Sequence, residues 1–175
     1  MIERKAKVTV NEWITHGNDA FLLTGARQIG KTYLIRQCLK ESGYPYIEFN
    51  FIEQPELVNL FAGAKDAKEL LMRLSVVAKE PLEQGKTIIF LDEIQHVKNF
   101  EKALASFRAT LDVSLFVTGS NSTLLSGELS TLLTGRTVEF EVLPFSFYEM
   151  KQYYEINKMD WSDDLFSNYL KWGGF

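Results

Sequence analysis

The segment from Gly25 to Thr32 constrains the possible fold of this chain more than any other part of its sequence. It matches the pattern G-x-x-x-x-G-K-[S/T] at every fixed position. Its members are Gly25, Ala26, Arg27, Gln28, Ile29, Gly30, Lys31 and Thr32. The apolar run before it predicts a buried strand, and the residues from Lys31 to about Lys40 predict a helix. A strand, a glycine turn and a helix in this order predict a phosphate-binding loop.

Backbone N–H groups and one lysine would bind phosphate in such a loop. Glycines let the chain turn tightly, so that successive N–H groups point at one anion, and the helix dipole adds to the attraction. We expect Lys31 to contact the β and γ phosphates of a nucleotide and the Thr32 hydroxyl to coordinate magnesium. Arg27 and Gln28 lie inside the loop without a specific role.

Two carboxylates follow a second apolar run. The residues from Ile88 to Leu91 are typical of a central parallel strand that is buried on both faces, and Asp92 and Glu93 come directly after them. Open α/β sheets bind ligands at this end of their strands. We expect Asp92 to hold magnesium opposite Thr32, and Glu93 to act as the general base for water. The alternative is a pair of solvated acids that cap the next segment.

A polar cluster and an arginine are further candidates for the site. Ser120 and Asn121 follow a predicted strand, where they could hydrogen-bond the attacking water or the γ-phosphate, or cap a helix. Arg136 could stabilise developing negative charge from a neighbouring subunit of a homo-oligomer. A surface salt bridge is the alternative for Arg136.

Apolar runs and helical spacing alternate along the chain, which predicts an α/β fold. The predicted strands are Ala20 to Leu23, Tyr46 to Phe51, Thr87 to Leu91, Ser114 to Thr118 and Thr137 to Val142. The predicted helices are Lys31 to Lys40, Leu57 to Phe61, Ala67 to Ala78 and Phe100 to Leu111. We take residues 1–143 as one domain and residues 144–175 as the aromatic start of a helical lid or linker. We expect the chain to be a fragment of a longer protein.

The charge and composition of the chain limit the classes of partner that it can bind. A net charge of −4 gives no basic field, so we expect no direct nucleic acid contact from this segment. No run approaches the roughly 20 apolar residues that span a bilayer. The start of the sequence leads into no apolar stretch of signal-peptide type, so we expect a cytoplasmic protein. The single cysteine, Cys38, has no partner for an internal disulfide.

Several motifs together resemble one family across about residues 20–175. They are the loop above with Leu23 and Thr24, Phe90 to Gln95, Thr118 to Ser120, Gly135 with Arg136, and Pro144 to Glu149. This set is similar to the AAA-type P-loop ATPases of bacteria and archaea whose ATPase domain precedes a poorly characterised C-terminal domain.

The resemblance implies a three-layer α/β sandwich with a five-stranded, mainly parallel sheet and a small helical lid. It also implies ATP and Mg²⁺ as ligands, with Lys31, Thr32, Asp92 and Glu93 in the roles given above. ATP hydrolysis would be coupled to the C-terminal domain, which lies outside this chain. A second arginine of the lid would also lie outside it.

Three other functions share the phosphate loop. A GTPase is suggested by Asn157 to Asp160, which matches N-K-x-D, but a polar, helical segment precedes it instead of an apolar strand. Gln95 also stands where a GTPase switch needs glycine. A small-molecule kinase needs several lid arginines, whereas Arg136 alone follows Thr123. An ATP-binding switch with negligible turnover stays open as the main alternative.

Overall fold

The computed structural model describes residues 2, 4–17, 20–62, 64, 66–78, 83, 85–98, 100–101, 104–105, 114–119, 137–159 and 163–174. Five parallel strands form one sheet in the order β2-β3-β4-β1-β5. The strands are β1 (Ala20–Thr24), β2 (Tyr46–Asn50), β3 (Ile88–Asp92), β4 (Ser114–Thr118) and β5 (Thr137–Glu141). The predicted five-stranded parallel sheet is therefore confirmed.

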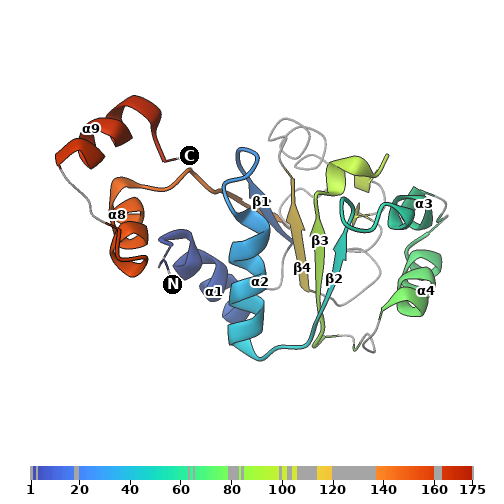
Figure 1. Ribbon diagram of the computed structural model, residues 1–175. Helices are drawn as coiled ribbons and strands as arrows, with labels where there is room; N and C mark the ends of the chain where they lie inside the picture. The colour runs from blue at the N-terminus through green and yellow to red at the C-terminus, as the bar shows by residue number, and fades with distance from the viewer. Residues whose placement is uncertain are drawn as a thin grey trace.

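Helices cover both faces of this sheet. They are α1 (Ala6–His16), α2 (Lys31–Ser42), α3 (Glu56–Ala62) and α4 (Ala67–Val77). One buried cluster joins α1 and α2 to Phe21, Phe90 and Phe116, and the other joins α3 and α4 to strand residues that point the opposite way, such as Leu22 and Ile89 (Figure 1). Successive strand side chains alternate between faces, so two separate cores follow from one sheet. The three-layer sandwich is confirmed.

Helix α1 is an element that the sequence analysis missed. Its buried residues Ala6, Val10, Trp13 and Ile14 follow helical spacing and face the sheet. The Trp13 ring lies 5.5 Å from the Phe21 ring and 4.3 Å from the Phe116 ring, measured between centroids. Aromatic packing against the central strands therefore holds α1 in place.

Two further helices follow β5 at the side of the sheet where α1 lies, opposite α3 and α4 (Figure 1). They are α8 (Phe147–Ile156) and α9 (Asp163–Trp172). Phe147 of α8 packs against Phe166 and Tyr169 of α9, with ring centroids 5.0 and 5.4 Å apart. The predicted change to aromatic, helical sequence after Pro144 thus corresponds to a pair of helices that contact each other.

The remaining predicted elements agree within one or two residues, except the helix from Phe100 to Leu111, most of which lies outside the described residues. A short 3₁₀ helix, η1 (Ile94–His96), follows β3. Within the parts of the chain that the structure describes, we find no helix that is long and apolar enough to cross a lipid bilayer.

Candidate active site

The predicted phosphate loop connects β1 to α2 at the carboxyl edge of the sheet. Three of its residues have positive φ angles: Gly25 at 135°, Gln28 at 65° and Gly30 at 85°. A Cβ atom at Gly25 would lie 2.3 Å from the Val142 carbonyl oxygen, so only glycine fits there. Gly30 immediately precedes the first turn of α2 and makes no side-chain capping bond. The first N–H groups of α2 therefore lie at the loop without a capping side chain, where they can bind an anion.

Lys31 lies almost fully buried beneath this loop. Its Nζ atom donates hydrogen bonds to the carbonyl oxygens of Gly25 at 3.0 Å and Ala26 at 2.7 Å. Burial lowers the pKa of Lys31, while the charges of Glu93 and Asp92 oppose that shift. The loop thus encloses a cationic group next to its backbone N–H groups.

Asp92 collects hydrogen bonds from three elements at the end of β3. The Thr32 hydroxyl lies 3.0 and 2.9 Å from its two carboxylate oxygens, and the Asn50 side-chain amide donates to Oδ2 at 2.8 Å. The Thr118 hydroxyl donates to Oδ1. Only 1% of Asp92 is exposed, so it is no solvated surface acid. Burial raises its pKa, the hydroxyls of Thr118 and Thr32 oppose that rise, and the charges of Glu93 and Glu48 add to it.

Asn50 and Thr118 are the residues of this cluster that the sequence analysis did not assign. Each ends a strand adjacent to β3, and Asn50 pairs with Asp92 in the sheet register. The Asn50 side-chain oxygen also accepts hydrogen bonds from the N–H groups of Ile52 and Glu53, both at 2.9 Å. A polar residue at the carboxyl end of each predicted parallel strand was the available signal.

Glu93 lies beside this cluster in an unusual backbone conformation. Its φ and ψ of 59° and 48° are left-handed, which is uncommon for residues other than glycine and is found at functional sites. Its N–H donates to the Thr118 hydroxyl at 3.0 Å, and its carboxylate accepts from the Gln95 side-chain amide at 2.5 Å. Glu93 makes no side-chain capping bond to η1, so a capping role does not explain it.

These groups surround one pocket of about 430 Å³. Its lining includes Arg27, Gln28, Gly30, Lys31, Thr32, Asn50, Asp92 and Glu93. The predicted phosphate ligands and the predicted carboxylates are therefore brought together in one place. Ser120, Asn121 and Arg136 lie outside the described residues, so their predicted roles stay predictions.

Arg36 also lines this pocket, beside Arg27 and Lys31, and the sequence analysis did not assign it. Its guanidinium lies 2.6 Å from the Glu48 carboxylate and 3.0 Å from the Glu53 carboxylate. The hydrogen bond to Glu48 raises the pKa of Arg36, burial opposes that rise, and Glu53 adds to it. Arg36 thus binds two carboxylates of the chain directly, whereas the hydrogen bonds of Lys31 go to backbone carbonyl oxygens.

A second, mostly apolar pocket of about 380 Å³ adjoins the first. Gln28, Gly30 and Tyr33 line both. The second pocket, but not the first, is also lined by the apolar side chains of Ile2, Leu34, Phe145, Tyr153 and Ile156. A polar compartment and an apolar compartment therefore meet at the phosphate loop.

Comparison with known proteins places this arrangement in a family. Residues 17–151, more than half of the chain, match the family described as AAA domain. An uncharacterized protein of Haemophilus influenzae is 33% identical over 163 residues, which are 88% of this chain and 38% of that protein. An uncharacterized protein of Methanocaldococcus jannaschii is 32% identical over 168 residues, which are 90% of this chain and 36% of that protein. The chain thus spans less than two fifths of the length of these relatives.

Solved structures of two other proteins share the fold. The Aeropyrum pernix Orc1 protein, solved in complex with DNA, has a TM-score of 0.59 and 18% identity, with 90% of this chain and 50% of that chain covered. The Thermotoga maritima RuvB Holliday junction branch migration motor has a TM-score of 0.56 and 17% identity, with 93% and 54% covered. At these identities the likeness concerns the fold. The chain belongs to the AAA domain family of P-loop nucleotide-binding proteins.

Proposed function

We propose that this chain binds ATP with magnesium in the pocket around Lys31 and hydrolyses it. The observation that carries the proposal is the Thr32 hydroxyl within 3.0 Å of both Asp92 carboxylate oxygens, beside Lys31 and Glu93 in one pocket. A hydroxyl, a carboxylate, a lysine and a second carboxylate are the groups that metal-assisted phosphoryl transfer requires.

The donor set fits magnesium. Mg²⁺ prefers oxygen ligands and is held in nucleotide sites by one or two protein groups together with phosphate oxygens. The Thr32 hydroxyl and the Asp92 carboxylate would hold it, and the ion would neutralise charge on the phosphates. Burial raises the pKa of Asp92, so a nearby cation would favour its charged form.

Glu93 is the proposed general base. An ionised carboxylate at this position could accept a proton from water as the water attacks the γ-phosphate. Lys31 would leave the carbonyl oxygens of Gly25 and Ala26 and bind phosphate oxygens instead. Ser120 and Asn121 are proposed to orient the water or the γ-phosphate, and Arg136 to act from a neighbouring subunit.

The apolar pocket supports a nucleotide as the ligand. A nucleoside triphosphate carries a flat base at one end and a polyanion at the other, and the two adjoining pockets match that division. The GTPase alternative gains no support, because Asn157 caps the C-terminus of α8 and its side-chain amide donates to the Tyr153 carbonyl oxygen at 2.7 Å. Guanine recognition by N-K-x-D would need it at the end of a strand.

One observation favours the alternative of an ATP-binding switch. The hydrogen bond of 2.5 Å from the Gln95 amide to the Glu93 carboxylate holds the proposed base on Gln95 and occupies one of its oxygens, which is then not free to contact a water. In the switch, ATP would bind without turnover while this bond persists. We further propose that residues 144–175 begin a helical lid, that turnover drives a C-terminal domain, and that the protein is cytoplasmic.

ATP binding by the Lys31→Ala variant tests the proposal. Because the substitution removes the cation at the centre of the loop, we expect calorimetry to show an ATP affinity lower by at least about a hundredfold. Lys40→Ala is the matched control, since Lys40 is exposed in the last turn of the same helix, and should keep the affinity of the wild type. Equal affinity of the wild type and Lys31→Ala would contradict the proposed site.

A further inference from the structure

Arg4, just before α1, contacts three separate parts of the chain. Its Nη1 atom donates to the Ile29 carbonyl oxygen of the phosphate loop at 2.7 Å, and Nη2 donates to the Leu143 carbonyl oxygen at 2.6 Å. Its Nε atom lies 3.5 Å from the Glu149 carboxylate, and its guanidinium lies 4.5 Å from the centre of the Phe145 ring. One side chain thus joins the loop to the connection between β5 and α8.

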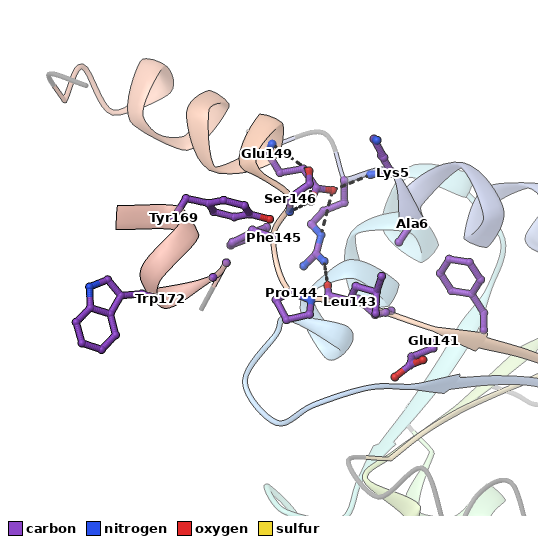
Figure 2. A pocket seen from close by; sticks show the side chains of 15 residues that line it. Lys5, Ala6, Glu141, Leu143, Pro144, Phe145, Ser146, Glu149, Tyr169 and Trp172 are labelled. Atoms are coloured by element: carbon purple, nitrogen blue, oxygen red, sulfur yellow. Dashed lines mark hydrogen bonds and ion pairs between the residues drawn. The ribbon is translucent and has the colours of Figure 1, made fainter. Parts of the chain in front are cut away.

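Glu149 holds Arg4 from the first turn of α8. Its Oε1 atom accepts the Lys5 N–H at 2.9 Å, and Oε2 accepts the N–H of Ser146 at 2.7 Å and its hydroxyl at 3.0 Å. Figure 2 shows Glu149, Ser146 and Lys5 meeting at the edge of a pocket of about 570 Å³. Although burial opposes it, these hydrogen bonds and the charge of Arg4 lower the pKa of Glu149. The carboxylate is therefore charged and fixed.

The peptide bond between Ile29 and Gly30 connects the Arg4 hydrogen bond to the backbone of the phosphate loop. In a trans peptide the carbonyl group and the following N–H point in opposite directions. Arg4 donates to the Ile29 carbonyl and lines the adjoining apolar pocket, but it is not among the residues that line the pocket of Lys31, Thr32 and Asp92. A fixed carbonyl therefore directs the Gly30 N–H away from Arg4. Because glycine has a wide range of backbone conformations, this orientation depends on an external contact.

We propose that Arg4 is a positioning residue, and that Arg4 and Glu149 form a strut which orients the Gly30 N–H for phosphate from outside the loop. The part of the proposal that concerns nucleotide affinity rests on the proposed function. Because the strut ends on α8, a displacement of α8 would change phosphate affinity, and phosphate binding would by linkage change the position of α8. The strut is thus a physical connection between the loop and the segment that follows β5.

Arg4→Met removes the strut and keeps an apolar stem of similar length. Arg73→Met is a matched control, because Arg73 also binds a backbone carbonyl and a carboxylate, those of Leu60 at 3.1 Å and Glu69 at 2.5 Å, far from the loop. In the protein without nucleotide, we expect Arg4→Met to shift the ¹³C carbonyl resonance of Ile29 and the amide resonance of Gly30. Arg73→Met should leave both unchanged.

Nucleotide affinity supplies the second readout. Loss of a charge-assisted hydrogen bond should weaken Mg-ATP binding by about tenfold in Arg4→Met. Arg4→Lys should recover only part of that loss, because one ammonium group cannot bind two carbonyls and a carboxylate as a planar fork does. If Arg4→Met fails to fold, Glu149→Gln, which keeps the shape of the side chain, replaces it in both measurements.

The two proposals fail in different ways. Unchanged Ile29 and Gly30 resonances in a folded Arg4→Met or Glu149→Gln variant would overturn the strut, whatever the nucleotide affinity. Shifted resonances together with a wild type that binds no ATP would support the strut and overturn the proposed function. Shifted resonances with full ATP affinity in Arg4→Met would show that Arg4 does not position the loop for phosphate, and would also overturn the strut.

Discussion

Two buried carboxylates of this protein have opposite surroundings. Glu149, 4% exposed, faces the guanidinium of Arg4 and accepts hydrogen bonds from two backbone N–H groups and a hydroxyl. Asp92, 1% exposed, accepts its hydrogen bonds from uncharged donors, two hydroxyls and an amide. The pKa of Glu149 is accordingly lowered, and that of Asp92 is raised by burial.

The difference separates a carboxylate that supports the fold from one that is suited to a ligand. A buried charge costs free energy unless its own structure compensates it. The chain compensates Glu149 with Arg4 and leaves Asp92 with neutral donors beside the phosphate loop. Perturbed carboxylates of this second kind concentrate at functional sites. The comparison predicts that substitution of Asp92 affects chemistry and substitution of Glu149 affects stability.

The largest expected effect concerns turnover. Asp92→Asn removes the proposed magnesium ligand and should lower phosphate release at saturating Mg-ATP by about a thousandfold. Glu149→Gln should lower it by tenfold or less, because Glu149 reaches the site only through Arg4. Steady-state phosphate assays on both variants measure the difference. A greater loss in Glu149→Gln than in Asp92→Asn would reverse the assignment of the two carboxylates.

The free energy of unfolding should respond in the opposite order, with a larger loss on substitution of Glu149 than of Asp92. Glu149→Ala leaves the partly buried Arg4 guanidinium without its carboxylate and should lower the free energy of unfolding by about 2 kcal/mol. Asp92→Asn removes a buried charge and should change that free energy by less than about 1 kcal/mol. Urea denaturation without nucleotide measures both values. Equal losses in the two variants would show that Asp92 supports the fold as much as Glu149 does.

The dependence of stability on pH is the smallest effect. The folded pKa of Glu149 lies below its ordinary value of 4.5, so its contribution is present above pH 4.5 and is lost as the pH falls through the folded pKa. Asp92 has a raised pKa, so its unfavourable charge is relieved as the pH falls. We therefore expect the acid-induced loss of stability to be shallower in Glu149→Gln and steeper in Asp92→Asn. Urea denaturation from pH 3 to pH 7 would show identical slopes if neither carboxylate titrates in this way.

Much of the site could be predicted because its signals are local. The loop motif, its strand and its helix are contiguous, and the rule for the carboxyl ends of parallel strands placed Asp92 near Thr32. Asn50 and Thr118 lie 42 and 26 residues from Asp92 and meet it through the strand order, so the polar residue at each strand end was their only signal in the sequence. The contact of Lys5 with Glu149 spans 144 residues and left no pattern in the sequence.

Helix α1 was not predicted for a different reason. Its sequence contains Val8, Thr9, Val10 and Thr15, whose branched side chains favour strands over helices. Packing of Trp13 against Phe21 and Phe116 overrides that local preference. Tertiary contacts of this kind are not visible in local residue preferences, whereas the continuous apolar run of β3 was visible because both of its faces are buried.

The central claim is tested most directly by comparing the wild type with Glu93→Gln. The measurement is phosphate release from ATP and from GTP, with and without magnesium. Glutamine keeps the shape of the side chain but cannot accept a proton from water. The account predicts magnesium-dependent, ATP-selective release by the wild type, and a loss of at least about a hundredfold in Glu93→Gln with ATP binding retained. Equal release by the two proteins would contradict the assignment of Glu93 as the base of an ATP-hydrolysing site.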